Sequence, residues 1–148
     1  MCSKMRQTAK PYLDLLEKQR EELNAFPIAY AFNKEQMEEA LTKLGAEKSE
    51  CVTIFGHGDI VKKENAPKFI AMLKRHSGEI KELIRDKDIA EAAFRYEMDN
   101  HEYAINYDGD EEVLRCFGID EEELTEMGLR DAYHNARRAH MRDAQEWM

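Results

Sequence analysis

The stretch CVTIFGHGDIVK, residues 51–62, decides the fold class of this chain. It holds two short runs rich in β-branched and aromatic residues, separated by Gly56-His57-Gly58-Asp59. Glycine at two of the four turn positions supplies the positive φ angles that a tight hairpin turn requires. The pattern predicts strands at 51–55 and 60–62 that pair as a hairpin, which places a sheet in an otherwise helical chain.

On the N-terminal side of this hairpin, the sequence predicts a helix, a strand and a second helix. Apolar residues in 9–23 recur at helical spacing, and because proline is tolerated only in a first turn, Pro11 predicts that Thr8 caps this helix. Residues 28–32 are apolar and aromatic-rich, as in a buried strand. Asn33 and Gln36 have the spacing of a capping box for a helix that ends at Gly45.

On the C-terminal side, helical patterns dominate. A helix begins near Pro67, is expected to break at Ser77-Gly78 and resumes over 79–85, and a further helix is expected at Asp88. Residues 101–107 alternate like a strand, and Asp110 and Asp120 are expected to cap two short helices. The sequence thus predicts one α+β domain over 1–148, helix-dominated, with a three- or four-stranded sheet and a C-terminal amphipathic helix over 128–148.

Four segments together resemble a family of small uncharacterised bacterial proteins, some associated with mobile elements. They are NAFPIAYAFNKEQMEEALTKLG, VTIFGHGDIVKKEN, NHEYAINYD and VLRCFGI. The resemblance covers roughly residues 20–120. It implies a compact α+β domain and mobile-element biology. It carries no activity, so no catalytic residue is transferred from it.

Charge is strongly segregated along the chain. Residues 97–127, the acidic segment, carry twelve acidic side chains and one basic side chain, Arg115, which leaves 19 acidic and 21 basic residues elsewhere. The segment therefore has a net charge of −11 and the rest of the chain +2, in agreement with the total of −9. Such a field attracts basic partners and argues against direct nucleic-acid binding by this segment.

This asymmetry favours a non-enzymatic interaction protein whose acidic segment docks a basic surface of a nucleic-acid-handling protein. A concrete version is a phage- or mobile-element-encoded inhibitor of the anti-defence type. Negative side chains in the first turns of the two short helices also stabilise those helices, which is an alternative explanation for part of the charge. The partner-binding candidates are Glu97, Asp99, Glu102, Asp108, Asp110, Glu111, Glu112, Glu121, Glu122 and Glu123.

The acidic segment does not match a helix–loop–helix calcium loop. Such a loop requires glycine at position 6 and glutamate at position 12. Starting at Asp108, these positions hold Val113 and Ile119. The pattern therefore gives no reason to expect a metal, and no cofactor motif occurs.

A small enzyme is the alternative from another class. His57 lies in the hairpin turn, where Asp59 would orient it as a general base, and His101 would lie nearby. However, Ile60 and Val61 continue as strand, so GHGD is not a phosphate loop. A plain turn explains the same residues.

Two further features leave alternatives open at the C-terminus. Arg130, Arg137, Arg138 and Arg142 recur at helical spacing and form either a phosphate-binding stripe or a solvated face with salt bridges to the acidic segment. Tyr133 and Trp147 lie on an alanine-rich helix, which also suits a homodimeric scaffold.

Cysteine use and hydropathy predict a cytoplasmic protein. The three cysteines, Cys2, Cys51 and Cys116, form no CxxC pair, so free thiols in a reducing compartment are expected. The first ten residues lack the apolar core of a secretory signal. The longest apolar run, 25–32, is interrupted by Pro27 and is far shorter than a membrane helix.

Overall fold

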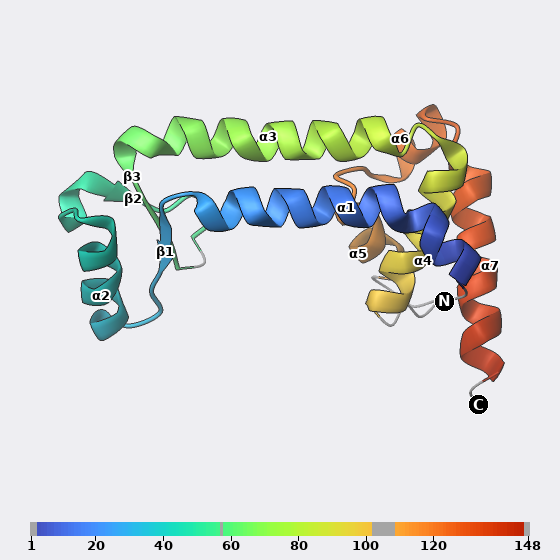
Figure 1. The fold of residues 1–148 in the computed structure, drawn as a ribbon, viewed down its shortest axis with the longest axis horizontal. Coiled ribbons are helices and arrows are strands. Elements are labelled where there is room, and N and C mark those ends of the chain that lie inside the picture. The colour runs from blue at the N-terminus through green and yellow to red at the C-terminus, as the bar shows by residue number, and fades with distance from the viewer. Residues whose placement is uncertain (1–2, 57, 102–108, 147–148) are drawn as a thin grey trace. The chain divides into compact units, whose positions relative to one another are not determined.

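The computed structural model describes residues 3–56, 58–101 and 109–146. The chain divides into two compact units: unit 1 comprises Met1–Glu17 and Ser77–Met148, and unit 2 comprises Lys18–His76. Helices dominate and one small antiparallel sheet is present, so the α+β prediction is confirmed (Figure 1). The prediction of a single domain stays a prediction. No helix in the described residues has the length and apolar character needed to cross a membrane.

Seven α-helices and two short 3-10 helices lie in the described residues. The two short ones are Lys48–Glu50 and Lys63–Asn65. The α-helices are α1 (Ser3–Ala25), α2 (Lys34–Leu44), α3 (Ala66–Leu83), α4 (Lys87–Asn100), α5 (Gly109–Arg115), α6 (Glu121–Glu126) and α7 (Arg130–Glu146).

The sheet lies in unit 2 and contains the predicted hairpin. Its strands are β1 (Ile28–Tyr30), β2 (Cys51–Val52) and β3 (Asp59–Lys62), in the order β1-β3-β2 with both neighbours antiparallel. Strand β2 is shorter than expected. The fourth strand expected at 101–107 lies outside the described residues, except for His101, which is the C-cap of α4.

Side chains of the central strand point alternately to the two faces of the sheet. Val61 packs on one face with Phe69 and Met72 of α3. Ile60 packs on the other with Ala40 of α2, which lies beside the sheet (Figure 1). The strand is thus buried on both faces, which explains why its two central residues, Ile60 and Val61, are both apolar.

The hairpin turn is held by a carboxylate. Asp59 is buried, and its side-chain oxygens accept hydrogen bonds from the backbone N–H groups of Ile54 (2.6 Å) and Phe55 (3.1 Å). Gly58 has φ +85°, and its carbonyl accepts from the Ala31 N–H. The turn therefore depends on local polar contacts and on a backbone conformation that favours glycine.

Replacing Gly58 by alanine is expected to lower the free energy of unfolding by about 2 kcal/mol. The new Cβ atom would lie 2.9 Å from the Ala31 carbonyl oxygen and 2.7 Å from the Phe32 ring. Gly56→Ala is the matched control, because Gly56 has φ +73° but open space around it. We expect it to cost about 1 kcal/mol. Equal losses for the two variants in urea denaturation would contradict the steric argument.

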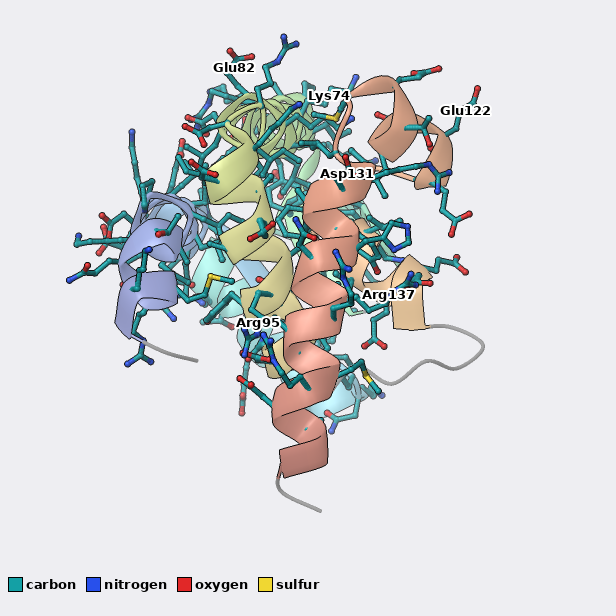
Figure 2. All side chains as sticks on the ribbon, turned by 90° about the vertical axis from the view of Figure 1, so that its right-hand side faces the viewer. Lys74, Glu82, Arg95, Glu122, Asp131 and Arg137 are labelled. Carbon is teal, nitrogen blue, oxygen red and sulfur yellow. The ribbon has the colours of Figure 1, made fainter. Side chains whose placement is uncertain are left out.

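Unit 1 is built around an aromatic core. The ring of Phe94 on α4 lies 4.9 Å from that of Phe117 and 5.3 Å from that of Tyr133 on α7, and Tyr12 of α1 stacks on Phe117 at 5.3 Å. Helices α4 and α7 lie side by side (Figure 2). This core joins residues from the start of the chain to residues from its second half.

Several helix ends were predicted correctly. Asn33 caps α2 by accepting from the Gln36 N–H, and Gly45 ends that helix with φ 63°. Asp120 caps α6 by accepting from the Glu123 N–H.

Other predicted helix ends were wrong. Thr8 is not a cap, because α1 begins at Ser3, contains Pro11 and has the Thr8 hydroxyl donating to the Lys4 carbonyl. Helix α3 continues through Ser77-Gly78. The N-cap of α4 is Asp86 rather than Asp88.

Candidate functional site

The candidate residues of the acidic segment occupy three kinds of environment in unit 1. Glu97 is buried with 5% exposure, so its assignment to a docking surface is corrected. Asp99 and Asp110 are partly buried, and each contacts a side chain of α7. Glu102 and Asp108 lie outside the described residues. The exposed or largely exposed candidates are Glu111, Glu112, Glu121, Glu122 and Glu123.

Most of the exposed carboxylates line one groove on unit 1, termed the acidic groove. Its volume is about 790 Å³, its apolar residues are Leu114 and Ile119, and its single basic residue is Arg115. Glu122 on α6 points outward (Figure 2). The acidic lining residues are Asp110, Glu111, Asp120, Glu121, Glu122 and Glu123.

The carboxylates of the acidic groove differ in the hydrogen bonds and ion pairs that they make within the protein. The Asp110 side chain accepts a hydrogen bond from the Tyr133 hydroxyl at 2.6 Å and lies 3.7 Å from Arg137. Glu123 lies 3.5 Å from Lys81. Glu121 and Glu122 are exposed, and no ion pair within the described parts of the chain reaches them. These two carboxylates are the most available to a partner.

Asp99 holds α4 to α7. Its carboxylate lies 2.6 Å from Nδ1 of His140 and 3.7 Å from Nε of Arg95. Arg95 is buried and also pairs with Asp143 of α7. Asp99 therefore stabilises a helix pair, which is a structural role the sequence analysis did not predict.

The four arginines of the α7 stripe have different surroundings. Arg137 reaches Asp110 of the acidic segment at 3.7 Å, in agreement with the internal salt bridges that one alternative expected. Arg138 donates to Asn135 on its own helix, and Arg130 donates to Thr125. Arg142 is exposed.

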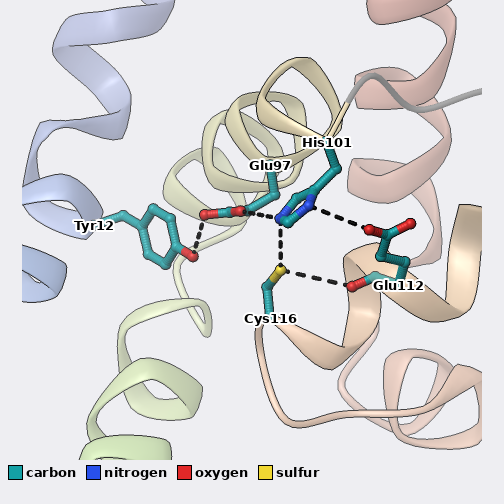
Figure 3. Close-up of polar contacts among 5 residues, drawn as sticks. All are labelled: Tyr12, Glu97, His101, Glu112 and Cys116. Atoms are coloured by element: carbon teal, nitrogen blue, oxygen red, sulfur yellow. Dashed lines mark hydrogen bonds and ion pairs between the residues drawn. The ribbon is translucent and has the colours of Figure 1, made fainter. Parts of the chain in front are cut away.

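A second constellation, termed the polar cluster, lies where α4 ends (Figure 3). Glu97 and His101, four residues apart on one helix face, lie 3.1 Å apart (Oε2 to Nε2). The Tyr12 hydroxyl donates to Glu97 Oε1 at 2.8 Å. The Cys116 Sγ lies 3.4 Å from His101 Nε2, and Glu112 Oε1 lies 3.4 Å from His101 Nδ1.

Burial controls the acid–base behaviour of the cluster's neutral members. Desolvation, with the nearby Glu97 carboxylate, raises the pKa of the Cys116 thiol to about 12. The same two causes raise the pKa of the Tyr12 phenol well above its ordinary value. The thiol is therefore protonated at neutral pH and is a poor nucleophile.

Of the alternative polar site, the structure describes Asp59 and His101, and the hypothesis of an enzyme around His57 stays a prediction. His57 lies outside the described residues. Asp59 is buried and uses both carboxylate oxygens to hold the hairpin turn, so it acts on the backbone of Ile54 and Phe55. His101 belongs to the polar cluster in unit 1, whereas Asp59 lies in unit 2.

One part of the polar cluster could be inferred from the sequence. The i, i+4 spacing of Glu97 and His101 places both on one face of a helix. Cys116 follows 15 residues later and Tyr12 precedes Glu97 by 85 residues. No local pattern links either of them to that helix face, so the sequence analysis missed the cluster.

Comparison with known proteins identifies the family of this chain. The model of DUF7659, a family of unknown function, matches residues 11–139. The chain belongs to this family. No curated protein and no solved structure matches it.

The DUF7659 match covers the parts of unit 1 that carry both constellations. It includes the acidic groove and all five residues of the polar cluster, from Tyr12 to Cys116. The expected resemblance to an uncharacterised family is confirmed at that level. A bacterial or mobile-element origin stays a prediction. DUF7659 supplies no activity, so function has to be argued from the side chains.

Proposed function

We propose that the protein is a non-enzymatic interaction protein that binds a basic segment of another protein in its acidic groove. The observation that carries this proposal is the composition of the groove. Six of its ten lining residues are acidic, one is basic, and Leu114 and Ile119 are apolar. A groove of this composition suits a peptide with lysine or arginine side chains around an apolar residue.

The one basic lining residue does little to neutralise the groove. Arg115 pairs with Glu111 at 3.3 Å, and both side chains are highly exposed. Exposed pairs of this kind contribute little energy and are screened by salt, so a ligand cation can replace Arg115 at small cost. With Glu121 and Glu122 also available, the groove offers at least three carboxylates to a partner.

The electrostatic field of the acidic segment also acts on a partner before contact. A net charge of −11 over residues 97–127 steers cationic surfaces toward the groove and keeps polyanions away. The expected partner is therefore a basic protein surface, for which a nucleic-acid-binding protein is a natural source. An inhibitor of the anti-defence type is the finer hypothesis, and it rests on the same charge.

The test measures binding of a defined peptide by fluorescence anisotropy. The probe is a labelled peptide of alternating arginine and leucine, with the full-length protein titrated at two salt concentrations. Replacing Glu121 and Glu122 by lysine changes two exposed groove residues without removing a cap or an ion pair of the described structure. We expect the affinity to fall by about tenfold or more, and the wild-type affinity to fall with added salt.

The matched control is replacement of Glu38 and Glu39 by lysine. Both residues are exposed on α2 in unit 2. Because two glutamates again become lysines, the net charge of the protein changes by the same amount as in the groove variant. This variant should keep its affinity within about twofold, since it leaves the groove unchanged. If both variants weaken binding to the same extent, the peptide follows net charge alone and the groove is not the docking site.

A further inference from the structure

The polar cluster brings three different metal-ligand types together. One carboxylate oxygen of Glu97, one imidazole nitrogen of His101 and the sulfur of Cys116 all lie within 4.8 Å of one another. Glu97 lies in the last turn of α4, His101 is the C-cap of that helix, and Cys116 follows α5 directly. The ends of two separate helices therefore supply the donors (Figure 3).

The donor spacings match those around a small tetrahedral cation. Zinc bond lengths of about 2.0 Å to nitrogen and oxygen and 2.3 Å to sulfur imply about 3.3 Å between N and O and about 3.5 Å between N and S. In the structure, His101 Nε2 lies 3.1 Å from Glu97 Oε2 and 3.4 Å from Cys116 Sγ. These two of the three donor spacings agree within about 0.2 Å, and the third pair, a Glu97 carboxylate oxygen and Cys116 Sγ, lies within 4.8 Å.

Hydrogen bonds hold these groups in place but leave the contact between His101 Nε2 and Cys116 Sγ without a strong bond. His101 Nε2 carries at most one proton, yet it faces both Glu97 Oε2 and Cys116 Sγ. One N–H group serves one of these acceptors well and leaves the other with a weak contact. The Cys116 thiol is itself a donor, with the Glu112 carbonyl oxygen 3.6 Å away, whereas a bound cation would contact the carboxylate, the imidazole and the sulfur together.

Neighbouring side chains already orient the donors. Glu112 Oε1 lies 3.4 Å from His101 Nδ1, which turns Nε2 toward Glu97 and Cys116. The Tyr12 hydroxyl engages Glu97 Oε1, which leaves Oε2 for the cluster. Carboxylates and hydroxyls that hold metal ligands in this way are a regular part of zinc sites.

We infer that Glu97, His101 and Cys116 form a binding site for a single divalent cation of the zinc class. Sulfur and imidazole donors select against magnesium and calcium, which take oxygen ligands. Three protein ligands leave a fourth position open, and the His101 side chain is 31% exposed, so solvent can reach it. Binding would tie α5 to the end of α4 and would replace the thiol proton of Cys116 by the metal.

The sequence alone gave no reason to expect a metal site. The acidic segment does not match a calcium loop, because Val113 and Ile119 occupy the glycine and glutamate positions. The cluster uses a different donor set. It also does not depend on the acidic groove, so the two proposals can fail separately.

The test uses the full-length protein, stripped of metal by a chelator that is then removed. Zn²⁺ is titrated in competition with a chromophoric chelator, and Co²⁺ binding is followed by absorption, because a cobalt–thiolate bond gives a charge-transfer band. We expect one equivalent to bind with that band present. Cys116→Ser and His101→Ala should each weaken Zn²⁺ binding by about 100-fold, and Glu112→Gln by about tenfold.

Matched controls remove the same residue types elsewhere. Cys51→Ser and His134→Ala should leave the affinity and the cobalt spectrum unchanged. Absence of the cobalt–thiolate band in the wild-type protein, its persistence in Cys116→Ser, or equal Zn²⁺ affinity in that variant would each overturn the site. Circular dichroism of the metal-free variants checks folding. Should Cys116→Ser fail to fold, the largely exposed Glu112 supplies the decisive variant, and unchanged Zn²⁺ affinity in Glu112→Gln then overturns the site.

Discussion

Replacing Phe94 by alanine is expected to lower the free energy of unfolding by about 3–5 kcal/mol. Phe94 is fully buried, and its ring makes edge-to-face contacts with both Phe117 and Tyr133. The loss combines the transfer free energy of the ring with the cavity left among side chains that cannot collapse fully. The aromatic pairs add about 0.5–1.5 kcal/mol beyond the buried area.

Chemical denaturation followed by circular dichroism measures this loss. Phe32→Ala is the matched control, because Phe32 is exposed in unit 2. A surface truncation of that kind is expected to change stability by no more than about 0.5 kcal/mol. A loss below about 1 kcal/mol for Phe94→Ala would mean that unit 1 repacks around the missing ring and that its core is not as the structure shows.

Replacing the next residue, Arg95, by alanine is expected to cost about 3 kcal/mol. The Arg95 side chain is 7% exposed, pairs with Asp143 and lies 3.7 Å from Asp99. Its removal leaves Asp99 without one cationic neighbour and deletes the apolar stem that packs between α4 and α7. The cost stays below that of Phe94→Ala because the Asp143 side chain is 46% exposed and rehydrates.

Two further variants separate charge from packing at this position. Arg95→Met keeps most of the stem and should recover part of the loss, whereas Arg138→Ala, an exposed arginine on α7, should change stability by less than about 0.5 kcal/mol. The measurement is again the free energy of unfolding. If Arg95→Met is as stable as the wild-type protein, the ion pairs contribute nothing net and the buried charge has another role.

The parts of the fold that were predicted correctly depend on contacts between residues close in sequence. The Asn33 and Asp120 caps each use a backbone N–H three residues downstream. The hairpin depends on a short glycine-containing turn. Such contacts can be inferred from residue type and spacing because the partners are always within reach.

The wrong predictions of helix ends have their cause in contacts between residues distant in sequence. Pro11 and Gly78 were expected to limit helices, and both lie inside one. Burial of Tyr12 beside Pro11, and of Ile80 and Ile84 after Gly78, supplies a packing energy that exceeds the local cost of about 1–3 kcal/mol. The sequence alone does not reveal which helices will find such partners.

The same distinction between local and tertiary contacts applies to the candidate sites. The acidic groove was anticipated in part, because charge density along the chain is a property of composition. The burial of Glu97 was not anticipated, because it depends on Tyr12 and on the fold that brings Tyr12 to it. Cys116 was likewise read as an ordinary free thiol, and only the structure places it beside His101.

The division of the chain into units has a consequence for the order of events during synthesis. Unit 2 is a continuous segment, Lys18–His76, whereas unit 1 needs Met1–Glu17 together with Ser77–Met148. A ribosome adds about 5–20 residues per second, so Tyr12 waits about 4–17 s before Glu97, 85 residues later, has been made. During that interval the first turns of α1 carry an apolar face with no partner. Unit 2 can therefore be complete while the first segment of unit 1 still waits for the second.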